Sequence, residues 1–122
     1  MKILIVDDDP GTINALKAGL SSFGYEVVEA KEGFQALGII TDSNDAAEPV
    51  DIVVSDLKMP GMTGLELIRS VRKTRPGLPS ILMTAFGSDD IRNHVMAMKS
   101  CEYIEKPFTP ENLMKKIQVL KD

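Results

Sequence analysis

Cysteine, tryptophan and histidine are nearly absent from this 122-residue chain, which has one cysteine, no tryptophan and one histidine. The single thiol, Cys101, excludes an internal disulfide and is typical of a reducing compartment; we predict that it is buried and inert. His94 falls within a predicted helix and has no partners at metal-ligand spacing. We therefore predict that it is an ordinary surface residue and neither a catalytic base nor a metal ligand.

Long apolar runs and an excess of basic charge are also missing. No stretch approaches the roughly 20 apolar residues that cross a bilayer. Three aspartates follow the short apolar run at the N-terminus, which argues against a signal peptide. Acidic residues outnumber basic ones by 18 to 14, which disfavours nonspecific binding to nucleic acid. We expect a cytoplasmic protein that binds neither membrane nor, by this domain, nucleic acid.

Short apolar runs alternate with segments of helical periodicity along the chain. Strands are predicted at residues 2–6, 25–30, 50–55, 80–83 and 102–104, each followed by a helix. Strands joined by single helices require right-handed crossovers and a parallel sheet. We therefore predict one α/β domain over residues 1–122, a flavodoxin-like, doubly wound (βα)5 fold with five parallel strands in the order 2-1-3-4-5.

Cap signals and periodicity define the predicted helices. Asp9 and Thr109 precede prolines and suit helix N-caps, and Ser88 or Asp89 suits the fourth helix. Gly24 is predicted to end the first helix, and the polar residues 42–49 form a surface loop. The residues predicted to face inward are Ile13, Leu16, Leu20, Phe23, Phe34, Leu37, Ile40, Leu65, Ile68, Val71, Ile91, Val95, Met98, Leu113, Ile117 and Leu120.

Four of the predicted strands finish in polar side chains: Asp7, Asp8 and Asp9; Asp56; Thr84; and Lys106. The carboxyl ends of parallel strands meet at one edge of the sheet, where open α/β sheets bind ligands. Clustered carboxylates repel one another unless a cation neutralises them, and Mg²⁺ favours carboxylates, waters and phosphate oxygens. The sequence therefore predicts a metal and phosphate pocket with Asp56 as a carboxylate nucleophile.

Motifs at all of these strand ends resemble one family. The runs ILIVDDDP (3–10), DLKMPGMTG (56–64), TA (84–85) and KPF (106–108) stand in the order and at the spacing of the receiver domain of bacterial two-component response regulators. The resemblance extends over residues 1–122. It implies that Asp56 is the phosphoacceptor, that Asp8 binds Mg²⁺ directly, and that Asp7 does so directly or through water. The backbone carbonyl of Lys58 would be a further ligand.

The same resemblance assigns roles to the last two strands. Thr84 and Lys106 would each bind a phosphoryl oxygen, and the peptide bond before Pro107 would be cis, which only a proline makes plausible. Tyr103 would be the switch aromatic that turns inward when Thr84 moves toward a phosphoryl group. The surface formed by the fourth helix, the fifth strand and the fifth helix would then rearrange.

The resemblance also implies partners and a mode of action. A sensor histidine kinase or a histidine phosphotransfer protein would supply the phosphoryl group, and a downstream effector protein or domain would respond, with homodimerisation on activation as one form of response. The domain would not be an enzyme, apart from phosphoryl transfer to itself and autodephosphorylation. Either the chain is a stand-alone regulator or it is part of a longer protein.

Each residue also has an ordinary explanation when it is considered alone. Adjacent Asp7 and Asp8 point to opposite faces if the chain is extended there, so one of them could be merely solvated. Lys106 could be a surface lysine, Thr84 a common strand residue, and Tyr103 a half-buried strand aromatic. An aspartate at a strand end is commonly a cap or turn former, and we assign that role to Asp9.

Three other function classes fit less well. A haloacid-dehalogenase-like phosphatase needs Asp-x-Asp-x-Thr after a strand, and residues 7–12 miss that pattern by one position and come without a cap domain. A binding module that uses this fold without phosphorylation would not need this set of polar strand ends. Nucleotide binding lacks a glycine-rich phosphate loop.

Two positions depart from the family pattern or extend it. Lys99 and Ser100 stand where family members often carry Gly-Ala, which affects the turn before the fifth strand. Phe86, two residues after Thr84, is bulky, and we predict that it restricts water at the acyl phosphate. Phe86→Ala should therefore shorten the phosphoryl lifetime.

Overall fold

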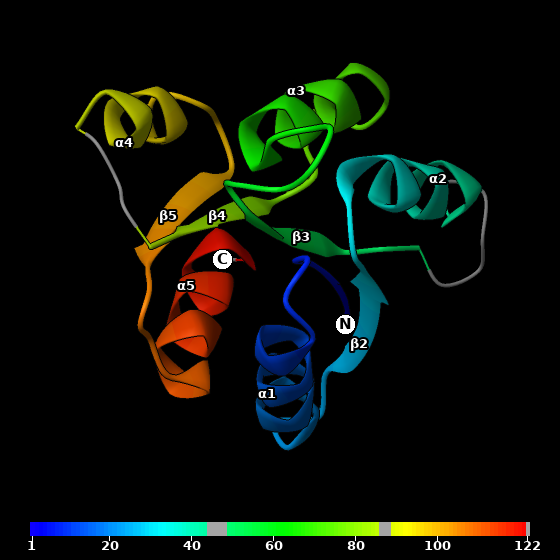
Figure 1. The fold of residues 1–122 in the computed structure, drawn as a ribbon, viewed down its shortest axis with the longest axis vertical. Coiled ribbons are helices and arrows are strands. Elements are labelled where there is room, and N and C mark those ends of the chain that lie inside the picture. The colour runs from blue at the N-terminus through cyan, green and yellow to red at the C-terminus, as the bar shows by residue number, and fades with distance from the viewer. Residues whose placement is uncertain (44–48, 86–88, 122) are drawn as a thin grey trace.

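The computed structural model describes all residues except 44–48, 86–88 and 122. Within the described residues, five strands alternate with five helices (Figure 1). The elements in chain order are β1 (Lys2–Val6), α1 (Pro10–Ser21), β2 (Glu26–Ala30), α2 (Gly33–Ser43), β3 (Ile52–Asp56), α3 (Gly64–Thr74), β4 (Ser80–Thr84), α4 (Asp89–Met96), β5 (Cys101–Glu105) and α5 (Pro110–Lys121).

The strands form one parallel sheet in the order β2-β1-β3-β4-β5, which confirms the predicted flavodoxin-like topology. Helices α1 and α5 cover one face of the sheet, and α2, α3 and α4 cover the other (Figure 1). The chain reverses its winding direction between β1 and β3, which therefore lie side by side at the centre of the sheet. In open α/β sheets this reversal point is where ligands bind.

The alternation of side chains along β1 supplies both halves of the core. Ile3 and Ile5 pack with residues of α1 and α5, while Leu4 and Val6 pack with residues of α2 and α3. All four side chains are fully buried. Burial of each such side chain stabilises the fold by about 1.5–3 kcal/mol. A strand that is apolar on both faces therefore fixes β1 in the middle layer.

Side-chain oxygens cap the predicted helix starts. Asp9 accepts hydrogen bonds from the backbone N–H groups of Gly11 and Thr12, both at 3.3 Å. The hydroxyl of Thr109 accepts from the N–H of Asn112 at 3.1 Å. Both predicted caps are confirmed, whereas Asp89 is the first residue of α4 and Ser88 lies outside the described residues. The loop predicted at residues 42–49 starts later than predicted, since α2 continues through Asp42 and Ser43, and residues 44–48 lie outside the described residues.

Two predicted core aromatics are wrong. Phe23 is 39% exposed and Phe34 is 63% exposed. Helix α1 ends at Ser21, so Phe23 lies in the following turn, which Gly24 closes with φ 87°. In α2 the buried stripe runs through Ala36 and Ile40, which leaves Phe34 on the outer side. Both residues lie at or just beyond a helix end, where the apolar repeat is too short to show which side of the helix a residue occupies.

Candidate functional site

The polar groups predicted at the strand ends lie together at the carboxyl edge of the sheet. Asp7 and Asp8 follow β1, and Asp56 is the last residue of β3. Lys106 follows β5 and places its Nζ 2.9 Å from Asp7 Oδ2 and 3.5 Å from Asp56 Oδ1. One ammonium group therefore joins the carboxylates of the two central strands. Thr84 is the last residue of β4, the strand between β3 and β5, and is buried.

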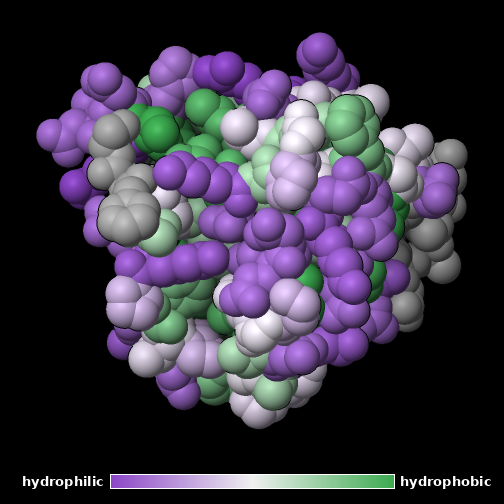
Figure 2. Space-filling view, viewed as in Figure 1, coloured by the Kyte–Doolittle hydropathy of each residue, from purple (hydrophilic) through white to green (hydrophobic). Residues whose placement is uncertain are grey.

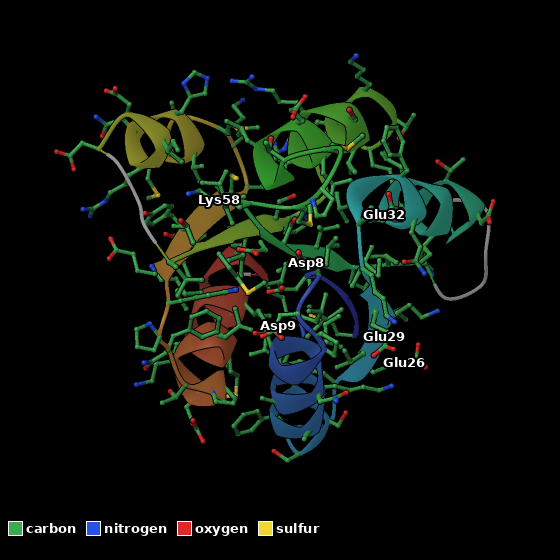
Figure 3. The ribbon with its side chains drawn as sticks, viewed as in Figure 1. Asp8, Asp9, Glu26, Glu29, Glu32 and Lys58 are labelled. Carbon is green, nitrogen blue, oxygen red and sulfur yellow. The ribbon has the colours of Figure 1, made fainter. Side chains whose placement is uncertain are left out.

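Three carboxylates form the centre of the site. Asp7, Asp8 and Asp56 each offer one oxygen, and these atoms lie within 4.8 Å of one another. Asp7 is 1% exposed, the Asp56 side chain is 14% exposed, and Asp8 is exposed, so the cluster opens to solvent beside Asp8. Asp8 lies near the middle of the view in Figure 3, and hydrophilic residues cover that region in Figure 2. Carboxylate oxygens that leave room for water suit Mg²⁺, so these donors fit that ion.

The charges in the cluster are only partly balanced by protein groups. Desolvation by burial and the nearby Asp7 carboxylate raise the pKa of Asp56, and Lys106 opposes them only in part. Burial lowers the pKa of the Lys106 ammonium, but its hydrogen bond and charge interaction with Asp7 outweigh burial and raise that pKa. Lys106 therefore stays protonated, and the three carboxylates hold more negative charge than one ammonium can neutralise. The site favours a further cation.

Backbone groups orient the carboxylate of Asp7. The N–H of Asp9 donates to Asp7 Oδ1 at 2.9 Å, and the N–H of Asp7 donates to the Ala30 carbonyl at 3.1 Å. Asp9 itself uses both carboxylate oxygens on α1, including a 2.7 Å hydrogen bond from the Thr12 hydroxyl. That bond is the largest of the effects that lower the pKa of Asp9. Asp9 is thus a cap, as predicted, while Asp7 faces Lys106.

Gly64 is a positioning residue to which sequence reasoning gave no role. The loop after Asp56 turns back so tightly that the Gly64 N–H donates to the Leu57 carbonyl at 2.8 Å. A Cβ at position 64 would lie 2.2 Å from the Asp56 carbonyl oxygen and 2.8 Å from Leu82 Cδ1. Only glycine fits there without moving the backbone of Asp56. The glycine was visible in the sequence, but this close approach depends on the tertiary fold.

The position of Lys106 depends on the ladder between β4 and β5. The Lys106 N–H donates to the Thr84 carbonyl at 2.8 Å, directly beyond the last residue of β5. The Lys106–Pro107 peptide bond is cis, as predicted. Lys58, whose carbonyl is a predicted metal ligand, is exposed in the loop between β3 and α3 (Figure 3). The roles of Thr84 and Lys58 toward a ligand stay predictions.

Tyr103 is buried in this structure rather than half-buried. It is 7% exposed and packs in a cluster with Leu57, Ile68, Leu82 and Val95. Burial, followed by the nearby negative charge of Glu105, raises the pKa of its phenol group. The ring therefore forms part of the core between the sheet and α3–α4. Its predicted motion as a switch stays a prediction.

Three further predictions concern single residues outside the carboxylate cluster: His94, Cys101 and Phe86. His94 is exposed and forms a hydrogen bond with Arg69, which confirms a surface position. Cys101 is buried, and burial raises the pKa of its thiol, which disfavours a reactive thiolate. Phe86 lies outside the described residues. None of the helices in the described part of the chain is long and apolar enough to span a membrane.

Comparison with known sequences places these features in a family. A family model described as the response regulator receiver domain matches residues 3–118. The transcriptional regulatory protein GlrR of Escherichia coli is 43% identical over 86 residues, covering 70% of this chain and 18% of GlrR. The response regulator MprA of Mycobacterium avium is 36% identical over 120 residues, covering 98% of this chain and 50% of MprA. The chain thus spans half or less of these relatives.

Solved structures agree with the sequences. The chemotaxis protein CheY4 of Vibrio cholerae superposes with a TM-score of 0.86 at 30% identity, covering 98% of this chain and 97% of the other. The response regulator TrrA of Thermotoga maritima, solved in complex with Mg(2+)-BeF, gives a TM-score of 0.83 at 34% identity with the same coverage. Together with the matched family model, these similarities show that the chain belongs to the response regulator receiver domains, the phosphoryl-accepting modules of two-component signalling.

Proposed function

We propose that this domain accepts a phosphoryl group on the Asp56 carboxylate, in a Mg²⁺-dependent transfer from a histidine kinase or a histidine phosphotransfer protein. The observation that carries the proposal is the position of Asp56. Its carboxylate ends the central strand β3, lies 3.5 Å from Lys106 Nζ, and shares a 4.8 Å cluster with Asp7 and Asp8. Its side chain is 14% exposed, which leaves one side open to a donor.

The residues of the chain can carry out the transfer as follows. An Asp56 carboxylate oxygen attacks the phosphorus atom, the P–N bond of the donor phosphohistidine breaks, and the electron pair stays on the imidazole nitrogen. Lys106 shifts from Asp56 toward a phosphoryl oxygen while Asp7 keeps its charge in place. Mg²⁺, held by the carboxylates of Asp7, Asp8 and Asp56 and the carbonyl of Lys58, would stabilise negative charge on the phosphoryl oxygens.

The transfer gives the site new acceptor oxygens and more negative charge. We propose that the Thr84 hydroxyl binds one of these oxygens, and that the surface formed by α4, β5 and α5 rearranges together with Tyr103. The packing of Tyr103 supports the proposed rearrangement, because its ring lies in the cluster that joins β5 to α3 and α4. A downstream partner or effector domain, or homodimerisation on activation, would read the change.

The output and the setting belong to the same proposal. GlrR is named a transcriptional regulatory protein and MprA a response regulator, and both are longer than this chain. We propose that this domain controls such an effector by phosphorylation, and that it acts in the cytoplasm without itself binding nucleic acid. It turns over no external substrate and is not an enzyme in that sense. Steady hydrolysis of a phosphate ester would instead favour the phosphatase alternative.

The proposal is tested by incubating the protein with acetyl phosphate and measuring its intact mass. The wild type should gain one phosphoryl group with Mg²⁺ and none when the metal is chelated. Asp56→Asn should gain none, while Asp90→Asn, which changes an exposed aspartate on α4, should behave as the wild type. No gain in the wild type, or equal gain in Asp56→Asn, would contradict the proposal and would favour a binding module without phosphorylation.

A further inference from the structure

Arg72, near the end of α3, binds backbone carbonyls of the turn that follows α3 and of Ser100, which is 28 residues away in the sequence. Its Nη2 lies 3.0 Å from the Ser100 carbonyl oxygen and 3.4 Å from that of Leu78, and its Nη1 lies 3.4 Å from that of Pro76. Ser100 belongs to the connection from α4 to β5, which runs beside α3 in Figure 1. The guanidinium group therefore ties this connection to the turn between α3 and β4.

Ser100 has an unusual backbone conformation. Its φ is 55°, and it is the only non-glycine residue with positive φ in the described part of the chain. The left-handed region costs an ordinary L-residue roughly 1 kcal/mol relative to glycine or to a relaxed conformation. In this conformation the Ser100 carbonyl oxygen accepts a hydrogen bond from Arg72. The hydrogen bond from Arg72 therefore favours a conformation that serine alone disfavours.

The same carbonyl begins the contact between β4 and β5. The buried Ser80 N–H donates to the Ser100 carbonyl oxygen at 2.9 Å, and Ser80 pairs with Cys101 in the sheet. The other end of this ladder is the Lys106 N–H bond to Thr84, at the carboxylate site. One carbonyl thus receives hydrogen bonds from Arg72 and from β4. Ser100 therefore lies where β5 begins to pair with β4, its neighbour in the sheet.

We propose that Arg72 is a positioning residue that locks the α4–β5 turn, by holding Ser100 in the left-handed conformation and so keeping β5 paired with β4 at its first residue. The lock acts in the unphosphorylated protein. It limits how often the turn opens and how far the strand that carries Tyr103 and leads to Lys106 departs from its place. The proposal concerns the resting conformation and does not require phosphorylation of Asp56.

Amide hydrogen exchange of Ser80, measured by NMR on the unphosphorylated protein, tests the lock directly. Arg72→Met should speed exchange of the Ser80 amide roughly tenfold, because the turn loses a hydrogen bond from a charged donor. Core amides of β1 and β3 should keep their wild-type rates. Adding Ser100→Gly to Arg72→Met should bring the Ser80 rate back to within about threefold of the wild type, since glycine adopts positive φ without strain.

Arg75→Met is the matched control. Arg75 also lies at the end of α3 and donates to a backbone carbonyl, that of Val50, at 2.6 Å. Its loss should leave exchange of the Ser80 amide unchanged. If Arg72→Met fails to fold, Arg72→Lys keeps the charge and the aliphatic stem but not the forked donor, and should give a smaller increase of about threefold.

Three results would overturn the proposal. The first is an unchanged Ser80 exchange rate in the Arg72 variants. The second is an increase that core amides of β1 and β3 share, since that would show a general loss of stability instead of a local lock. The third is a double variant, Arg72→Met with Ser100→Gly, that exchanges as fast as Arg72→Met alone.

Discussion

Asp56 has an environment that disfavours its charge when no metal is bound. Burial and the Asp7 carboxylate raise its pKa, and Lys106, shared with Asp7, compensates incompletely. A polar group kept in a position that costs stability is expected at a functional site. The stability lost to the Asp56 charge can therefore be measured by replacing this one residue.

Asp56→Asn should stabilise the metal-free protein at pH 7, by on the order of 1 kcal/mol, because it removes one charge from the carboxylate cluster. Since the folded protein raises the pKa of Asp56, the carboxyl group favours folding at low pH, and this contribution is lost as the pH rises through the folded-state pKa. The advantage of Asn should therefore appear at neutral pH and disappear below 3.8, the ordinary pKa of an aspartate side chain. Urea unfolding at several pH values measures it.

Magnesium provides the control for this prediction. Saturating Mg²⁺ should raise the midpoint of urea unfolding more in the wild type than in Asp56→Asn, because the variant loses one charged ligand. A variant that is less stable than the wild type at pH 7 without metal would contradict the described charge balance.

Gly64→Ala should destabilise the protein by roughly 2 kcal/mol or more, because the added methyl group would lie 2.2 Å from the Asp56 carbonyl oxygen. Gly38→Ala is the matched control. Position 38 lies in α2 with no atom within 4 Å of the added methyl group. That substitution should stabilise the protein by about 0.5–1 kcal/mol. Equal effects of the two substitutions on urea unfolding would show that the Asp56–Gly64 approach is less tight than described.

At the scale of single elements, α3 connects the site with the rest of the sheet. It begins directly after the loop that follows Asp56, with a capping box in which Glu66 Oε1 accepts from the Thr63 N–H at 3.0 Å and Thr63 Oγ1 accepts from the Glu66 N–H at 3.1 Å. It ends with Arg72 and Arg75, which bind carbonyls of neighbouring segments. The cap therefore holds the loop that follows the acceptor aspartate.

Thr63→Ala should lower the free energy of unfolding by about 1 kcal/mol. The Thr63 N–H and, to a smaller extent, the Thr63 hydroxyl lower the pKa of Glu66. The stabilisation from this carboxylate is therefore present above 4.5, the ordinary pKa of a glutamate side chain, and is lost as the pH falls through the folded-state value. Thr63→Ala keeps the N–H but loses the part of this stabilisation that comes from the hydroxyl. The effect of the substitution should thus shrink at low pH. Thr41→Ala, at an exposed position in α2, should change stability little. A pH-independent loss would argue against the coupled cap.

The succession of elements was predictable from local patterns, but several positions within them were not. Alternation of apolar runs with helical periodicity predicted every strand and the parallel topology, because single-helix crossovers allow little else. At their carboxyl ends β3 and β4 each extend one residue beyond the prediction, so that Asp56 and Thr84 are the last residues of their strands. The start of β3 was predicted two residues too early, since the strand begins at Ile52. Phe34 was wrongly predicted to face the core, because no local sequence signal at the start of α2 shows which side of the helix is buried.

At the scale of the whole molecule, the sheet brings together groups that are far apart in the sequence. The polar strand ends predicted the cluster of Asp7, Asp8, Asp56 and Lys106 correctly, since parallel strands align their carboxyl ends. The contacts of Gly64 and Arg72 could not be predicted, because each depends on distances between elements that no periodicity encodes. The burial of Tyr103 likewise depends on the packing of α3 and α4 against the sheet.

Locating the phosphoryl group on the chain decides whether Asp56 is the acceptor. The protein is incubated with acetyl phosphate and Mg²⁺, and the acyl phosphate is reduced with borohydride, which converts the modified aspartate to homoserine. Peptide mass analysis then identifies the modified position. We expect homoserine at position 56 only, dependent on Mg²⁺. Modification at Asp7 or Asp8 instead, or none under conditions where the protein is folded and binds Mg²⁺, would contradict the assignment of Asp56 as the phosphoacceptor.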